Sequence, residues 1–289
     1  MKFGLDVQNI GQYADPHALL QMAIDAERAG WDGFFLWDHI SFNANPPVQV
    51  VDPWIALAAI AARTRTIRLG TVVTPIARRR PWKVAREAVS LDHLSRGRLI
   101  LGIGLGWSSE FDFEQFGENG DFRIKAEKTD EALEILTGLW SAELFAYEGK
   151  HYRVKPSLFL PPPYQRPRIP IWIAGNWPNL APFRRAARWD GAFPLKVASA
   201  PGEWRLTPLE VAEMIGYIRS VRSDDSSFDV VVAGITSGED PATDHATVMT
   251  FAAAGCTWWL EALMDERGSF EEMRSRIRRG PPRIPVDLV

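Results

Sequence analysis

Two hydrophobic periods alternate along this chain. Short runs rich in β-branched residues, such as 2–7 and 67–75, have the pattern of buried strands, and the segments between them carry apolar residues at helical spacing. The first of these segments begins at Asp15-Pro16 and ends at Gly30, which are typical start and stop signals of a helix. The alternation predicts an α/β fold.

The pattern repeats often enough for its units to be counted. It predicts eight strands, at residues 2–7, 33–39, 67–75, 98–106, 169–175, 191–195, 228–234 and 257–261. It predicts a helix after each strand, at residues 16–30, 53–63, from 81 onward, 122–140, 180–189, 208–222, 244–254 and 270–278. Eight units in 289 residues fit a single (β/α)₈ TIM barrel over residues 1–289. A doubly wound open sheet also alternates, but it typically uses fewer strands.

One segment interrupts the repeat after the fourth predicted helix. Residues 145–154 alternate around a Glu148-Gly149 turn, and three consecutive prolines follow at 161–163. We therefore expect a hairpin with a proline-rich stretch, inserted at about 141–168 between the fourth and fifth barrel strands.

Composition narrows the class of protein. With 46% hydrophobic and 24% charged residues the chain is ordinary globular material, and its net charge of −3 gives no reason to expect nucleic acid or an anionic membrane as a partner. The single cysteine, Cys256, excludes an intrachain disulfide, and no apolar run approaches the roughly 20 residues that span a bilayer. The N-terminus lacks the apolar core of a signal peptide, so we expect a cytoplasmic protein.

A barrel enzyme carries its chemistry at the carboxyl ends of its strands. The second predicted strand ends at Asp38 and His39. An imidazole can exchange protons near neutral pH, and a neighbouring carboxylate can orient it or accept a hydrogen bond from a cofactor. His39 is therefore the candidate catalytic residue. A purely structural Asp-His pair at a strand end is the alternative.

Three other strand ends suit a ligand less specifically. The arginines at 78–80 suit a phosphate or an acidic substrate, although such a run is more often the solvated start of a helix. Glycines within 102–106 let a flat or phosphorylated ligand approach the backbone, or allow a bend in the barrel. Gly175 and Asn176 precede a helix whose N-terminus suits a cofactor phosphate, or they form a turn with an Asn cap.

Other chemistries lack their sequence motifs. The five histidines have no HExxH or close-pair spacing, and one cysteine excludes a cysteine-rich zinc site, so no metal is expected. Neither a Gly-x-Ser-x-Gly elbow nor a P-loop is present in the sequence. The 12 tryptophans are unusually many. Most fit a core, and we expect Trp37, Trp107 and Trp177, at strand ends, to wall a substrate pocket.

Several motifs together resemble the bacterial luciferase-like superfamily of flavin- and F420-dependent oxidoreductases. The motifs are AGWDG at 29–33 with WDH at 37–39, RLGTVVTP at 68–75 with RP at 80–81, LDHLSRGRL at 91–99 with LGIG at 101–104, EF at 110–111, Trp140, YEGKHY at 147–152 and PIWIAG at 170–175. The resemblance covers residues 1–196 clearly and the rest loosely. In this order the motifs are specific to the superfamily but not to a substrate.

The resemblance implies a TIM barrel with an isoalloxazine or deazaflavin ring over the carboxyl ends of its strands. The cofactor-binding residues that it implies are Asp38, Thr71, Val72, Gly104, Leu105, Gly106, Gly175 and Asn176. Among them Thr71-Val72 matches the family's non-prolyl cis peptide, which supports one face of the ring, and 175–176 would approach the phosphate.

Two departures from the family pattern bear on the reaction. Trp107 stands where the sugar dehydrogenases of the F420 branch carry a glutamate acid, and the flavin-phosphate arginine of luciferase, near Leu105, is absent. The first departure argues against the sugar dehydrogenase reaction, and because of the second, light emission is not implied. Within the superfamily we expect a monooxygenase that uses reduced FMN and dioxygen on a small organic substrate, with His39 as proton donor or acceptor. The resemblance also implies a separate flavin reductase that supplies the reduced FMN. A homodimer would be consistent with the same resemblance. F420-dependent hydride transfer is the alternative, and a non-catalytic flavin-binding barrel is the alternative of another class.

Overall fold

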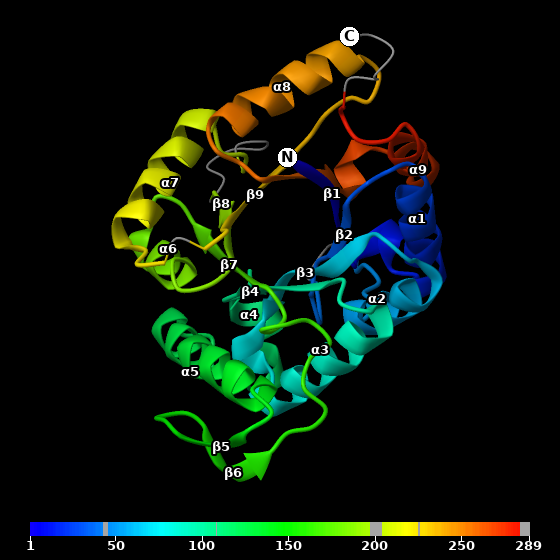
Figure 1. The fold of residues 1–289 in the computed structure, drawn as a ribbon. Coiled ribbons are helices and arrows are strands. Elements are labelled where there is room, and N and C mark those ends of the chain that lie inside the picture. The colour runs from blue at the N-terminus through cyan, green and yellow to red at the C-terminus, as the bar shows by residue number, and fades with distance from the viewer. Residues whose placement is uncertain (43–45, 108, 197–203, 225, 284–289) are drawn as a thin grey trace.

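Eight parallel strands close into a barrel in the order β1-β10-β9-β8-β7-β4-β3-β2, with helices around it (Figure 1). The strands are β1 (Lys2–Val7), β2 (Gly33–Leu36), β3 (Arg68–Pro75), β4 (Leu99–Gly104), β7 (Ile171–Asn176), β8 (Gly191–Leu195), β9 (Asp229–Gly234) and β10 (Trp258–Leu263). This computed structural model describes residues 1–42, 46–107, 109–196, 204–224 and 226–283. The predicted (β/α)₈ barrel is confirmed.

The helices begin where the sequence supplies a cap. Asp15 and Asp52 accept backbone N–H groups in the first turns of α1 and α2, and each helix has proline at its start. Asp240 caps α8 in the same way, so this helix begins three residues before the predicted position 244. The helices that follow barrel strands are α1 (Pro16–Arg28), α2 (Pro53–Arg63), α3 (Pro81–Ser95), α5 (Phe122–Trp140), α6 (Leu180–Ala186), α7 (Pro208–Val221), α8 (Pro241–Ala253) and α9 (Phe270–Arg278).

A two-stranded hairpin interrupts the barrel between β4 and β7. Its strands, β5 (Leu144–Glu148) and β6 (Arg153–Leu158), pair antiparallel and lie outside the ring of helices beside α5 (Figure 1). Glu131 on α5 fastens the turn, because its carboxylate accepts the backbone N–H groups of 150–152. The predicted insertion between the fourth and fifth barrel strands is confirmed.

Aromatic side chains fill the barrel interior. Phe35, Trp172 and Trp258 pack against one another with ring centroids 5.1 to 5.8 Å apart, and all three are buried. Nearer the carboxyl ends, three lumen positions are small. Ala174 lies two positions beyond Trp172 on β7, Ala233 two positions beyond Val231 on β9, and Ala262 four positions beyond Trp258 on β10. The aromatic group therefore forms a floor, and the small residues leave room above it, where the strands end.

Candidate functional site

Asp38 lies directly beyond β2 and is held by protein donors. Its carboxylate accepts hydrogen bonds from the Trp54 indole at 3.2 Å and the Thr74 hydroxyl at 2.8 Å. Nη2 of Arg79 lies 2.7 Å from Oδ1, and Nη2 of Arg78 lies 3.2 Å from the same oxygen. Asp38 is 3% exposed. Protein groups therefore engage both carboxylate oxygens, and Asp38 joins the chain segments that follow β2 and β3.

His39 reaches from the same strand end to a short helix, α4 (Ser109–Asp112). Its Nδ1 lies 3.0 Å from Oδ2 of Asp112, whose side chain is 1% exposed. The backbone of His39 is fixed by the Asn9 side chain, which donates to its carbonyl at 2.9 Å and accepts from its N–H at 3.2 Å. In the described part of the chain, no group forms a hydrogen bond with Nε2 of His39. This nitrogen is the one left for a ligand.

Arg78 links the two carboxylates of the site. Its Nη2 lies 3.2 Å from Asp38 and its Nη1 lies 3.3 Å from Asp112, and its side chain is buried. Burial lowers the pKa of the Arg78 guanidinium, while the two carboxylates act in the opposite direction. Burial alone would raise the pKa of Asp112, but the hydrogen bond and charge of His39, together with Arg78, outweigh it and hold this pKa below its ordinary value. Asp112 is therefore ionised at neutral pH and orients His39.

The lowered pKa of Asp112 predicts an acid-sensitive contribution to stability. Because the folded pKa lies below the unfolded one, the stabilisation is complete above about pH 5 and is lost as pH falls below about 4. Asp112→Asn should remove this contribution. The variant should therefore be less stable than the wild type at pH 7, and its free energy of unfolding should fall less when the pH is lowered. Urea unfolding between pH 7 and pH 3 measures this. The exposed variant Glu143→Gln should follow the wild type, and an equal acid loss in both variants would contradict the prediction.

A cavity of about 220 Å³ lies at these strand ends. It is lined by Asp38, His39, Ile40, Val50, Val51, Asp52, Arg78 and Arg79. The side chain of Arg79 is 21% exposed, whereas that of Arg78 is 4% exposed. The three arginines therefore differ in their surroundings. Arg78 and Arg79 turn inward to Asp38, and neither is part of a solvated helix start. Arg80 is exposed at the start of α3.

The rim of the barrel mouth is formed by half-buried side chains. Trp37, Val73, Leu195 and Trp204 pack against the lumen residues without being fully buried. The Trp37 ring also contacts His39, with 5.7 Å between the ring centroids. Trp37, predicted as a pocket wall, therefore stands between the lumen and His39.

The cis peptide was predicted one residue too early. The structure has a non-prolyl cis bond at Val72-Val73, not at Thr71-Val72. β3 pairs in register with β4 up to Thr71 and again from Thr74, so the irregular backbone falls on the two valines. The Thr71 hydroxyl lies 2.9 Å from that of Thr74 and 3.3 Å from the carbonyl of Gly102, which keeps Thr71 within the buried strand.

The end of β4 is shaped by packing against neighbouring side chains. A Cβ at Gly104 would lie 2.5 Å from Cγ2 of Val73. Gly106 has a φ of +86°, and a Cβ there would lie 2.8 Å from the Phe113 ring, so both constraints require glycine. Leu105 between them is half-buried. These contacts explain the glycines by the fold itself; their contact with a cofactor stays a prediction.

The end of β7 is likewise packed against its own helix. A Cβ at Gly175 would lie 2.1 Å from Cβ of Pro182 on α6. Asn176 is exposed, and Trp177 is half-buried with its ring 5.5 Å from that of Phe183. A role of Gly175 and Asn176 at a phosphate stays a prediction.

The segment between β4 and α5 contains a buried lysine. Lys125 on α5 is fully buried, with Nζ 3.0 Å from the Ser109 hydroxyl. Its ammonium lies 4.5 Å from the centroid of Phe113 and 4.0 Å from that of Phe122. Trp107, predicted as a pocket wall, is 73% exposed at the start of this segment.

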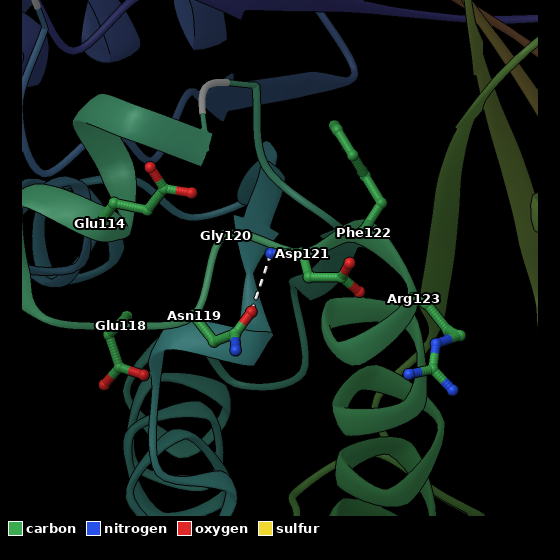
Figure 2. Close-up of a pocket in the computed structure, with 7 residues that line it drawn as sticks. All are labelled: Glu114, Glu118, Asn119, Gly120, Asp121, Phe122 and Arg123. Atoms are coloured by element: carbon green, nitrogen blue, oxygen red, sulfur yellow. Dashed lines mark hydrogen bonds between the residues drawn. The ribbon is translucent and has the colours of Figure 1, made fainter.

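A wide surface hollow of about 610 Å³ lies in the same segment. It is lined by Glu114, Glu118, Asn119, Gly120, Asp121, Phe122 and Arg123 (Figure 2). Within it the Asn119 side chain accepts the backbone N–H of Asp121 at 2.8 Å. The lining side chains are polar or charged apart from those of Gly120 and Phe122, whereas the mouth of the barrel is largely apolar.

Sequence reasoning missed the partner of His39. Asp112 lies in a stretch with other acidic residues, Glu110 and Glu114, and nothing in the sequence pattern distinguishes it. The predicted elements include no helix between the fourth barrel strand and residue 122, where the short helix that carries Asp112 lies. For Arg78 the sequence predicts a ligand for an anion or part of a solvated helix start, because it gives no sign that two carboxylates meet around this residue.

Two kinds of feature are absent from the described residues. None of the described helices combines the length and the hydropathy that a membrane span needs. The same residues contain no group of three or more histidine, cysteine, aspartate or glutamate side chains placed to hold a metal ion.

The family of the chain is decided by its similarity to known sequences. The family model described as luciferase-like monooxygenase matches residues 3–236. The chain belongs to this family. The predicted resemblance is therefore confirmed, and the family's relatives include F420-dependent enzymes.

Individual relatives of this luciferase-like protein differ in their named activities. A phthiodiolone/phenolphthiodiolone dimycocerosates ketoreductase from Mycobacterium sp. (strain JLS) is 32% identical over 212 residues, which cover 72% of this chain and 49% of the relative. An F420-dependent glucose-6-phosphate dehydrogenase from Nocardia farcinica is 30% identical over 233 residues, or 78% of this chain and 66% of the relative. The chain spans about half the length of most of the curated relatives it matches.

Solved structures support the barrel fold. Monooxygenase RslO1 from Streptomyces bottropensis superposes with a TM-score of 0.78 at 21% identity, covering 96% of this chain and 97% of that one. At this identity the likeness concerns the fold.

Proposed function

We propose that this luciferase-like protein is an oxidoreductase that binds a flavin-type ring cofactor at the barrel mouth and exchanges a proton with a small-molecule substrate through His39. One observation carries the proposal: the buried carboxylate of Asp112 holds Nδ1 of His39, and His39 lines a cavity at the strand ends. A histidine oriented in this way gives or takes a proton at one defined nitrogen, Nε2.

The barrel mouth has the chemistry that a flat, largely apolar ring requires. Its floor is aromatic, alanines leave space above the floor, and the half-buried side chains of Trp37, Val73 and Leu195 border it. These rim residues, with Leu105 at the end of β4, are the ones that would hold the ring. When bound, FMN or F420 supplies hydride or electron transfer.

The side chains around the mouth would have separate tasks. His39 would hold or move a proton at Nε2, next to the bound substrate. Asp112 would act as a positioning residue, because its carboxylate contacts His39, Arg78 and the backbone N–H of Ile40 in the described part of the chain. The apolar floor would exclude water from the reacting groups.

Of the two cofactors, F420 has the stronger support. Curated relatives named F420-dependent glucose-6-phosphate dehydrogenase are 29 to 32% identical to this chain. Dehydrogenases and ketoreductases both interconvert an alcohol and a carbonyl group, which needs one hydride and one proton. We therefore favour hydride transfer between F420 and an alcohol or carbonyl substrate, with His39 handling the proton. Glucose-6-phosphate itself is not proposed, because Trp107 replaces the glutamate acid of the sugar dehydrogenases.

An FMN-dependent monooxygenase is the second candidate. The absence of that glutamate favours it, and it would require dioxygen and a separate reductase that supplies reduced FMN. For either cofactor, we also propose that the protein is a homodimer and is located in the cytoplasm.

Anaerobic titration with reduced F420 and, separately, with reduced FMN tests the cofactor. Quenching of the intrinsic tryptophan fluorescence reports binding, with free tryptophan amide as a control for light absorbed by the ligand. We expect F420 to bind about tenfold or more tightly than FMN, a difference of about 1.4 kcal/mol. Tighter binding of FMN would reverse the order and favour the monooxygenase. Binding of neither would overturn the proposed function, and binding without turnover of any substrate would favour a non-catalytic barrel.

A further inference from the structure

Asp6 is an acidic residue inside the barrel. On β1 the odd positions Phe3, Leu5 and Val7 belong to the core between strands and helices. The even positions point the other way: a Cβ at Gly4 would lie 2.7 Å from Leu260 and 3.2 Å from Phe35, both lumen residues. Asp6, two residues after Gly4 on the same face, therefore points into the lumen at the carboxyl end of β1.

The carboxyl group of Asp6 has one hydrogen-bond partner in the described part of the chain. The Trp37 indole N–H donates to its Oδ1 at 2.6 Å. Oδ2 receives no hydrogen bond from the described residues, and Asp6 is 4% exposed. A buried carboxyl group with one neutral donor and no cation is favoured in its protonated form. Accordingly, burial raises the pKa of Asp6 to about 7, although the Trp37 hydrogen bond acts in the opposite direction.

Among the residues that the structure describes, no other charged side chain faces Asp6. From β2 it meets Phe35, its register partner, and from the residue directly after β2 it meets Trp37. From β10 it meets Ala262, while the neighbouring Glu261 faces the opposite side and binds Arg267 and Arg276. His39 is separated from Asp6 by Trp37: the indole of Trp37 donates to Asp6, and its ring contacts the ring of His39.

The position of Asp6 relative to the mouth makes it accessible to a bound ligand. It lies at the level of Ala262, one of the small residues above the aromatic floor. Its indole partner, Trp37, belongs to the half-buried rim. A planar ligand resting on this floor would therefore meet the carboxyl group at its edge.

We propose that Asp6 is a further binding residue of the site, which donates its carboxyl proton in a hydrogen bond to an electron-rich oxygen or nitrogen at the edge of the bound ring. This inference rests on the proposed function, because the ring is the cofactor proposed above. The ligand class is a planar heterocycle that carries or gains negative charge. A neutral Asp6 stabilises such an edge, whereas an ionised Asp6 repels it. Binding should therefore weaken as pH rises through the titration of Asp6.

The first test follows Asp6 in the protein without ligand. In carbon-13 NMR of aspartate-labelled protein, the carboxyl resonance that is missing in Asp6→Asn should titrate near pH 7. Trp37→Phe should move this midpoint upward, because the indole N–H stabilises the carboxylate. A midpoint near 4, the ordinary value for aspartate, would overturn the proposal.

The second test measures dissociation constants of reduced F420 and reduced FMN at several values between pH 6 and pH 8.5. For the wild type we expect the affinity for the cofactor to fall about tenfold for each pH unit above the pKa of Asp6. Asp6→Asn, which has nearly the same size and can still accept from Trp37, should bind with little pH dependence. The exposed variant Asp224→Asn should keep the wild-type profile.

The outcomes separate the two proposals. If the wild type binds a cofactor but Asp6→Asn has the same pH profile, the role of Asp6 is overturned and the proposed function stands. If the wild type binds neither cofactor, the proposed function and the role of Asp6 are overturned together.

Discussion

Replacing His39 by alanine should lower kcat of the cofactor-dependent reaction by about 10²- to 10⁴-fold, the usual contribution of a positioned general acid or base. The fold should survive, because the backbone of His39 is held by Asn9 and, among the described residues, its side chain has one hydrogen-bonding partner, Asp112. Turnover is measured from the absorbance of the cofactor that the titration selects, and folding from circular dichroism.

A double-mutant cycle makes this test specific. Asp112→Asn alone should lower kcat less than the loss of His39, because it disturbs only the orientation of the ring. In the His39→Ala background it should cost little further turnover, since Asp112 acts through His39. The exposed variant His17→Ala on α1 should retain full activity. Undiminished turnover in His39→Ala would rule out the proton-transfer role.

Asp38→Asn should destabilise the protein by about 3–5 kcal/mol, the cost of removing one partner from a buried ion pair. The change keeps the size of the side chain but leaves Arg78 and Arg79 without their shared negative charge, and Arg78 is 4% exposed. Unfolding in urea, followed by circular dichroism at pH 7, measures the effect.

A surface ion pair provides the matched control. Glu148 pairs with Arg153 at 3.4 Å on the hairpin, and both side chains are more than 70% exposed. Glu148→Gln should change stability by about 0.5 kcal/mol or less. A loss below about 1 kcal/mol in Asp38→Asn would mean that the two arginines find other partners or water, contrary to the buried network described above.

The fold could be predicted because its signals are local. Lys2–Val7, Gly191–Leu195, Phe122–Trp140 and Phe270–Arg278 begin and end where the hydrophobic period and the caps indicate. Predictions failed at strand ends, where the expected β2 and β4 continue for two or three residues beyond the observed ones. There the chain leaves the barrel to build the site, so hydrophobic continuity no longer implies strand pairing.

The site could be predicted only in part, because its geometry depends on contacts between distant segments. His39 followed from its place at a strand end. Its partner Asp112 lies 73 residues further along the chain, and the bridge through Arg78 needs three strand ends to converge. Asp6 did leave a signal: it is the one acidic residue of the first strand, and its neighbours at positions 3–5 and 7 carry no polar side chain.

The burial of Lys125 has a practical consequence for chemical labelling. Its amino group is enclosed by two phenyl rings and the Ser109 hydroxyl, so an amine-reactive reagent can reach it only when α4 and the start of α5 separate. Acetylation of this lysine, read by mass spectrometry, therefore counts openings of the segment that carries Asp112. The reactivity of Lys125 therefore reports how often α4, and with it the Asp112 carboxylate that orients His39, moves away from α5.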